Sequence, residues 1–175
     1  MIEDKIKAAV RDVPDFPSPG ILFKDISPLF QDPDLCREII QALAEPWKNS
    51  GINVVAGVES RGFLFGPQLA LALNASFIPV RKKGKLPYET HSLAYDLEYG
   101  QAEIEMHTDA ISKGDKVLVH DDLLATGGTA AAASDLISIA GGEICGFSFL
   151  IELSFLNGTP KLKERCRNIS ILARW

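Results

Sequence analysis

The segment from Val117 to Ala130 most constrains what this chain can fold into. It begins with the apolar residues 117–119, typical of a short buried strand, and it leads into a helical pattern over 130–140. Asp121 and Asp122 fall where the strand is expected to end, and a run of small residues with two glycines and two threonines follows them. The segment therefore predicts a buried strand that passes through a tight loop into a helix.

The small-residue loop has the composition of an anion-binding turn. Gly127 and Gly128 have no Cβ, so the backbone there can take a positive φ and approach a ligand closely. Thr126 and Thr129 add hydroxyl donors. The first amides of the following helix have no helical acceptor and lie at the positive end of the helix dipole. A phosphate group is the expected ligand.

The acidic pair indicates a second ligand group beside the phosphate. The carboxylates of Asp121 and Asp122 would repel a phosphate, but they could accept bonds from paired sugar hydroxyls or hold the waters of a Mg²⁺ ion. The loop and the pair together favour a sugar phosphate. No Lys follows the glycines as in a Walker A loop, and G-x-G-x-x-G is absent, which disfavours nucleotide hydrolysis and dinucleotide binding. An ordinary strand-to-helix turn is the alternative.

Length and composition predict one globular domain. A chain of 175 residues can bury a sizeable core, and 46% hydrophobic with 23% charged residues is an ordinary balance. The net charge of −5 argues against a nucleic-acid partner. No apolar run reaches membrane-spanning length and the N-terminus lacks the build of a secretory signal, so we expect a cytoplasmic protein without membrane contact. Three scattered cysteines predict neither disulfides nor a zinc site.

Strands and helices alternate along the rest of the chain. We expect strands over 52–58, 77–80, 103–106, 116–120, 144–151 and 169–173, and helices over 3–12, 33–45 and 63–73. This order predicts an α/β domain with a central, mostly parallel twisted sheet and helices on both faces. Ligands bind such sheets beyond the carboxyl ends of the strands, so we expect the turns 59–62, 81–85 and 121–129 to meet there. Residues 82–99 show no period and predict a long loop, either disordered or a functional lid.

Two segments carry a family resemblance. Residues 121–129 closely resemble the phosphoribosyl-pyrophosphate (PRPP) binding motif of type I phosphoribosyltransferases, in the version of the adenine enzymes. Residues 57–66 resemble the pyrophosphate-binding loop of the same enzymes. The resemblance implies the type I phosphoribosyltransferase fold and purine salvage, in which adenine and PRPP give AMP and pyrophosphate. It also implies Mg²⁺ as cofactor, a homodimer and a cis peptide at Glu59-Ser60.

The resemblance assigns roles to individual residues. It places the 5-phosphate of PRPP on the loop residues Ala125, Thr126, Gly127, Gly128 and Thr129. It places pyrophosphate on Glu59, Ser60, Arg61, Arg81 and Lys85, the last two within reach of a partner subunit. It makes Arg61, Asp121, Asp122 and Glu98 catalytic. The acidic pair would hold the ribose hydroxyls and help place Mg²⁺, mostly through water or PRPP, and Glu98 would manage the proton on the adenine ring.

Two further segments resemble parts that cover the ligands. Residues 1–32 are expected to form an N-terminal helix and a hood, because 16–28 resembles the base-covering hood of the adenine enzymes. The hood residues Ile21, Leu22, Phe23 and Lys24 would hold adenine above Leu123, although Lys24 stands where the family often carries Arg. Residues 82–100 match a flexible lid that closes over PRPP to exclude water, and this lid contains Glu98 and Tyr99.

Two other functions stay open on the sequence alone. Another phosphoribosyltransferase, for guanine, hypoxanthine, xanthine or orotate, is disfavoured by the hood and by Leu123-Leu124 after the acidic pair. A non-catalytic PRPP-sensing regulator would use the same fold in transcriptional control. Such a regulator normally adds a DNA-binding domain, and residues 1–14 are too short for one.

Overall fold

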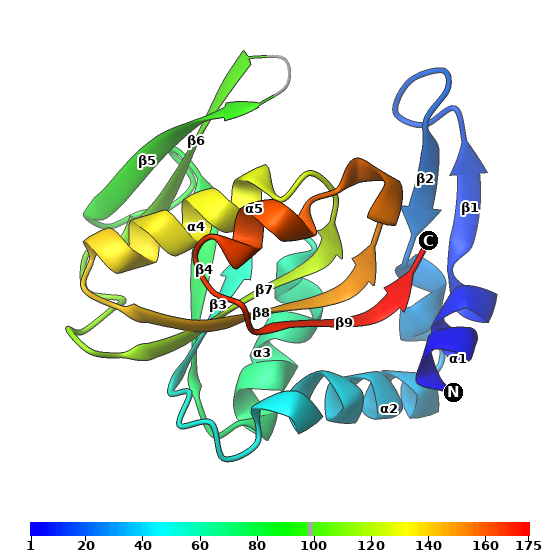
Figure 1. Ribbon diagram of the computed structural model, residues 1–175, viewed down its shortest axis with the longest axis horizontal. Helices are drawn as coiled ribbons and strands as arrows, with labels where there is room; N and C mark the ends of the chain where they lie inside the picture. The colour runs from blue at the N-terminus through cyan, green and yellow to red at the C-terminus, as the bar shows by residue number, and fades with distance from the viewer. Residues whose placement is uncertain (98–99) are drawn as a thin grey trace.

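The computed structural model describes residues 1–97 and 100–175 as a sheet covered by helices, with a small hairpin beside it (Figure 1). The sheet strands are β3 (Val54–Val58), β4 (Ser76–Lys82), β5 (Thr90–Leu97), β6 (Gly100–His107), β7 (Lys116–Leu124), β8 (Glu143–Glu152) and β9 (Ile169–Arg174). The hairpin strands are β1 (Arg11–Pro14) and β2 (Leu22–Asp25). The helices are α1 (Ile2–Ala9), α2 (Pro33–Ala44), α3 (Gly62–Ala72), α4 (Gly128–Ile139) and α5 (Thr159–Lys163).

The main sheet is mostly parallel. Within the described residues its strand order is β5-β6-β4-β3-β7-β8-β9, and the five strands from β4 to β9 in that order run parallel. The strands β5 and β6 pair antiparallel at one edge. β7 lies between β3 and β8, so the predicted ligand loop leaves the middle of the sheet. The predicted α/β class is confirmed.

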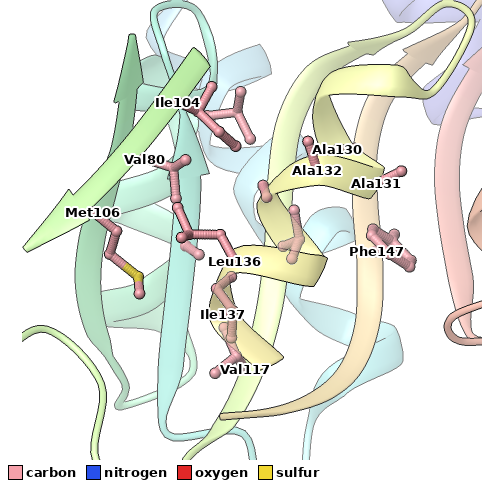
Figure 2. Close-up of a cluster of buried hydrophobic side chains, with 14 of the residues drawn as sticks. Val80, Ile104, Met106, Val117, Ala130, Ala131, Ala132, Leu136, Ile137 and Phe147 are labelled. Atoms are coloured by element: carbon pink, nitrogen blue, oxygen red, sulfur yellow. The ribbon is translucent and has the colours of Figure 1, made fainter. Parts of the chain in front are cut away.

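A hydrophobic core lies on each face of the sheet. Alternate residues of β7 face opposite sides, so Val117 and Val119 pack with α4 while Leu118 packs with α2 and α3. The α4 side of the core carries the consecutive buried alanines 130–133, which Figure 2 shows in part against Phe147 of β8. Because alanine side chains are short, α4 can lie close to the sheet, and its first turn stays near the end of β7.

The boundaries of α2 follow the predicted capping chemistry. The Asp32 side chain accepts hydrogen bonds from the backbone amides of Asp34 and Leu35, both at 3.0 Å, and Pro33 begins the helix. The helix ends at Ala44, and Pro46 lies in the 3₁₀ turn Glu45–Trp47 that follows. The predicted start at Pro33 is confirmed, and the predicted end at residue 45 is confirmed to within one residue.

Three expectations were wrong in detail. The segment 82–100 is not a loop throughout, because β5 occupies its second half and pairs with β6 over 90–97. An edge strand exposes its outer side, so polar residues there hid the strand pattern. The acidic pair does not follow the strand but lies inside β7, which pairs with β8 as far as Leu124. The first helix ends at Ala9 and not at residue 12, because the chain enters β1.

Among the described residues, no helix is long and apolar enough to cross a membrane.

Gly146 of β8 generates a stability prediction. A Cβ at this position would lie 2.3 Å from Trp47 Cη2 and 3.0 Å from the Asn168 carbonyl oxygen. We expect Gly146→Ala to lower the free energy of unfolding by about 1–3 kcal/mol through overpacking, measured by urea unfolding. The matched control is Gly128→Ala, where the nearest heavy atom lies 3.9 Å from the added Cβ. Equal midpoints for Gly146→Ala and the unsubstituted protein would contradict this account.

Candidate active site

The loop after β7 has the backbone geometry that an anion site requires. Gly127 caps α4 with a φ of 78°, in the left-handed region that favours glycine. The helix then begins at Gly128, so the amides of its first turn have no acceptor within the helix. The loop from Ala125 to Thr129 therefore presents glycines, hydroxyls and helix-start amides in one place, as predicted.

Gly158, which was not among the predicted site residues, packs against the backbone of this loop. A Cβ on Gly158 would lie 2.2 Å from the Ala125 carbonyl oxygen, and one on Gly127 would lie 2.8 Å from the Gly158 carbonyl oxygen. Two glycines from segments far apart in the chain thus pack backbone against backbone. Asn157-Gly158 reads in sequence as an ordinary turn, and no sequence signal connects it to the loop.

Arg61 and Asp122 join the second loop to the acidic pair. Arg61 caps the start of α3, and its Nε lies 3.0 Å from Asp122 Oδ2. The same guanidinium lies 5.0 Å from the centroid of the Phe23 ring in the hood strand β2. Residues predicted for pyrophosphate, ribose and base are therefore in contact at the carboxyl ends of the strands.

Burial makes ionisation of the acidic pair unfavourable. Asp122 is only 3% exposed, and its amide donates to Asp121 Oδ1 at 2.8 Å. Burial and the neighbouring Asp122 charge raise the pKa of Asp121 well above its usual value. Burial also raises the pKa of Asp122, while Arg61 acts in the opposite direction. Such a pair is stabilised by a cation or by hydroxyl donors, which is the binding chemistry predicted for it.

Two residues that flank the pair set its surroundings. A Cβ on Gly62 would lie 2.9 Å from the His120 carbonyl oxygen and 3.1 Å from Asp121 Oδ1, so only glycine lets α3 start this close to β7. His120 is fully buried, and burial lowers its pKa to about 4. The imidazole is therefore neutral at pH 7 and adds no positive charge to the site.

The predicted pyrophosphate residues at the ends of β3 and β4 include a cluster around Glu59. The peptide between Glu59 and Ser60 is cis, as the resemblance implied. The Glu59 carboxylate accepts hydrogen bonds from Arg81 Nε at 3.1 Å and from the Lys82 amide at 2.9 Å. Burial acts against ionisation of Glu59, yet these hydrogen bonds hold its pKa below the usual value. Arg81 also donates to the Lys85 carbonyl oxygen at 3.1 Å, so the turn 81–85 is anchored to Glu59.

The hood residues divide between two surroundings. Phe23 lies against Arg61, whereas its neighbour Lys24 is buried, with its Nζ 2.6 Å from Asp12 Oδ1 and 5.0 Å from the Trp175 ring centroid. Adjacent strand residues face opposite sides, which explains the division. The Lys24 ammonium thus serves the hood's own packing, and its contact with the base stays a prediction.

An apolar cavity of about 480 Å³ lies beside the hood. Ile21 and Leu22, both predicted to hold adenine, line it at 45% and 49% exposure. Phe155 and Leu156, which were not among the predicted site residues, line it from the segment after β8. The apolar run around Leu153–Leu156 was the available signal. Leu123 is half-buried at the α3 side of the sheet. Glu98 and Tyr99 lie outside the described residues.

The fold and the site define a phosphoribosyltransferase. A sequence model of the phosphoribosyl transferase domain matches residues 28–165. The adenine phosphoribosyltransferase of Cytophaga hutchinsonii is 51% identical over 175 residues, covering 100% of this chain and 97% of the relative. The chain belongs to the adenine phosphoribosyltransferase family.

Solved structures agree with this assignment. The crystal structure of adenine phosphoribosyltransferase from Rhodothermus marinus has a TM-score of 0.92 and 50% identity, and the match covers 99% of this chain and 98% of that one. The Saccharomyces cerevisiae enzyme, complexed with D-2,5-dideoxy-2,5-imino-altritol 1,6-bisphosphate and adenine, has a TM-score of 0.90 and 42% identity, with 98% of each chain covered. The predicted type I phosphoribosyltransferase fold is confirmed.

The raised pKa of Asp121 predicts a stability cost for the site. A carboxyl whose pKa is raised in the folded protein stabilises the fold at low pH, and that contribution is lost as the pH rises through the folded pKa. We expect Asp121→Asn to raise the unfolding temperature at pH 7.5 by about 2–4 °C, the shift of roughly 1 kcal/mol in a chain of this size. The difference should shrink as the pH falls toward 4. Thermal unfolding across this pH range measures it.

The control for this prediction is the exposed Asp109, whose change to Asn removes the same charge from the surface. We expect Asp109→Asn to leave the unfolding temperature nearly unchanged at both ends of the pH range. A lower unfolding temperature for Asp121→Asn at pH 7.5 would mean that the carboxylate stabilises the fold, contrary to the argument from burial.

Proposed function

We propose that this protein transfers the 5-phosphoribosyl group of PRPP to N9 of adenine, giving AMP and pyrophosphate in purine salvage. The observation that carries the proposal is the ion pair between Arg61 and Asp122 beside Phe23, because it unites three ligand-binding segments. The Cytophaga hutchinsonii relative and the Rhodothermus marinus structure match at least 99% of this chain and are adenine phosphoribosyltransferases, which supports the choice of base.

For this reaction the protein has to position the two substrates and stabilise the charges that develop. Adenine N9 attacks C1 of the ribose, the bond from C1 to the pyrophosphate oxygen breaks with inversion, and the ring loses a proton. The 5-phosphate would lie on the loop 125–129 at the start of α4, and the carboxylates of Asp121 and Asp122 would accept bonds from the ribose hydroxyls. We propose that Glu98 manages the proton on the adenine ring, as the family resemblance implies.

Charges at the site match those that develop in the reaction. The carboxylates of the acidic pair would stabilise positive character on the ribose ring, and Arg61, 3.0 Å from Asp122, would stabilise the departing pyrophosphate. Arg81 and the exposed Lys85 add positive charge in the neighbouring turn. No covalent intermediate is needed, since bound substrates can react directly.

We propose Mg²⁺ as the cofactor, held by Asp121 and Asp122 mostly through water or PRPP oxygens. The residues fit this ion, because both offer hard oxygen ligands, and the buried Asp122 Oδ2 has the Arg61 guanidinium 3.0 Å away but accepts no hydrogen bond among the described residues. Among those residues, no group of three or more His, Cys, Asp or Glu could hold a metal, which favours indirect contacts. When bound, the ion would neutralise charge on the pyrophosphate.

We propose that the base is held by the hood and covered by the lid. Phe23 of β2 and Leu123 of β7 would enclose the adenine ring, and the exposed Ile21 and Leu22 would extend the apolar surface. Closure of the lid segment 82–100, which includes Glu98 and Tyr99, would keep water from the activated C1. The pairing of β5 with β6 gives this lid a hairpin as its base.

The first experiment measures turnover with each free base. We expect AMP from PRPP, Mg²⁺ and adenine, and no nucleotide from guanine, hypoxanthine, xanthine or orotate, measured by chromatography. Asp122→Asn and Arg61→Ala should each lower kcat at least 100-fold, because they remove charge at the reacting centre; this is an order-of-magnitude expectation of roughly 3 kcal/mol.

The surface changes Asp109→Asn and Arg37→Ala serve as matched controls, since both residues are exposed and outside the site. Circular dichroism confirms that each variant folds. If the protein binds PRPP but forms no nucleotide from any base, the enzyme hypothesis is wrong and the PRPP-sensing regulator is favoured. If it forms nucleotide from another base in preference to adenine, the proposed base specificity is wrong.

We also propose a homodimer that uses the outer side of α3. Leu64 and Leu71 are exposed, Leu71 to 80%, and seven residues apart they lie on one side of the helix. Phe30, also exposed, stacks on Phe65 of the same helix with ring centroids 4.8 Å apart. Light scattering should give twice the chain mass, and Leu71→Arg should give the monomer. The exposed Ile139 on α4 provides the control Ile139→Arg, which should remain dimeric.

A further inference from the structure

A tyrosine of the edge strand reaches the phosphate loop. Tyr95 lies on β5, and its hydroxyl is 3.1 Å from Thr129 Oγ1 in the first turn of α4. The Tyr95 ring is half-buried and packs against the core on the α4 side of the sheet. Two segments that are distant in the sequence therefore share one hydrogen bond next to the loop expected to hold the 5-phosphate.

The direction of this hydrogen bond follows from the chemistry of the two hydroxyls. A phenol is a stronger acid than an aliphatic alcohol, so Tyr95 is the better donor and Thr129 the better acceptor. When Thr129 accepts from Tyr95, its own proton is free to point away toward a ligand. A phosphate oxygen accepts but does not donate when ionised, so it would bind this outward proton.

We propose that Tyr95 is a positioning residue for the 5-phosphate: its hydroxyl orients the Thr129 hydroxyl so that Thr129 donates to the phosphate group. The inference rests on the proposed function, because it assumes that the loop 125–129 binds that phosphate. Hydroxyl pairs of this kind strengthen each other, since an oxygen that accepts a hydrogen bond becomes a better donor. The ligands affected are those that carry a 5-phosphate.

The test compares Tyr95→Phe with the unsubstituted protein in binding ribose 5-phosphate and pyrophosphate. The substitution keeps the packed ring and removes only the hydroxyl. We expect the dissociation constant of ribose 5-phosphate, measured by calorimetry, to rise about 3- to 10-fold, which is the size of one modest hydrogen bond. The dissociation constant of pyrophosphate should change less than about 2-fold. In turnover, KM for PRPP should rise while KM for adenine stays constant.

Three further variants separate orientation from simple packing. Thr129→Ser retains a hydroxyl and should bind ribose 5-phosphate nearly as well as the unsubstituted protein. Thr129→Ala should weaken binding, and adding Tyr95→Phe to it should cause no further loss, because the two residues act through one hydrogen bond. Ser112→Ala is the control: Ser112 is exposed and lies outside the loop 125–129 and the lid, and the loss of its hydroxyl should leave both dissociation constants unaltered.

Each outcome bears on the proposal. Equal binding of ribose 5-phosphate by Tyr95→Phe and the unsubstituted protein would overturn it and leave the proposed function standing. A lower unfolding temperature with weakened binding of both ligands would show a structural role for Tyr95, which also overturns it. Failure of the unsubstituted protein to bind ribose 5-phosphate would overturn the proposed function together with this inference.

Discussion

The burial of two adjacent carboxyl groups is the constraint on which the rest of the site depends. Asp121 and Asp122 lie within the central strand β7, where burial raises the pKa of both. Arg61 offsets part of this cost through its ion pair with Asp122, and it also contacts Phe23 of the hood. The fold thus keeps a charged centre that is costly on its own, and substrate hydroxyls and a cation can stabilise it further.

Glycines allow the backbone segments around this centre to approach one another. Gly62 brings the start of α3 against β7, and Gly158 brings a late turn against the phosphate loop at Ala125. Side chains at these positions would separate elements that must stay in contact. The placement of Arg61 and the acidic pair therefore depends on close backbone packing as much as on the charged side chains themselves.

The elements with a strong local signal were predictable. The strand, loop and helix around β7 and α4, and the Asp32-Pro33 start of α2, follow from apolar runs, glycines and capping chemistry. The edge strand β5 was missed because one side of it faces solvent and carries polar residues. The ion pair of Lys24 with Asp12 was not predicted, because it joins the two strands of the hairpin, and the contact of Lys24 with the base stays a prediction.

The sequence by itself determined the α/β class, the family motifs and the residue types proposed to bind a phosphate and a ribose, because each depends on a short run of neighbouring residues. Only the tertiary structure decided which distant residues meet: Arg61 with Phe23, Gly158 with Ala125, and Tyr95 with Thr129. Such contacts depend on how strands pair and helices pack across the whole sheet. The local propensities of neighbouring residues do not determine that pairing.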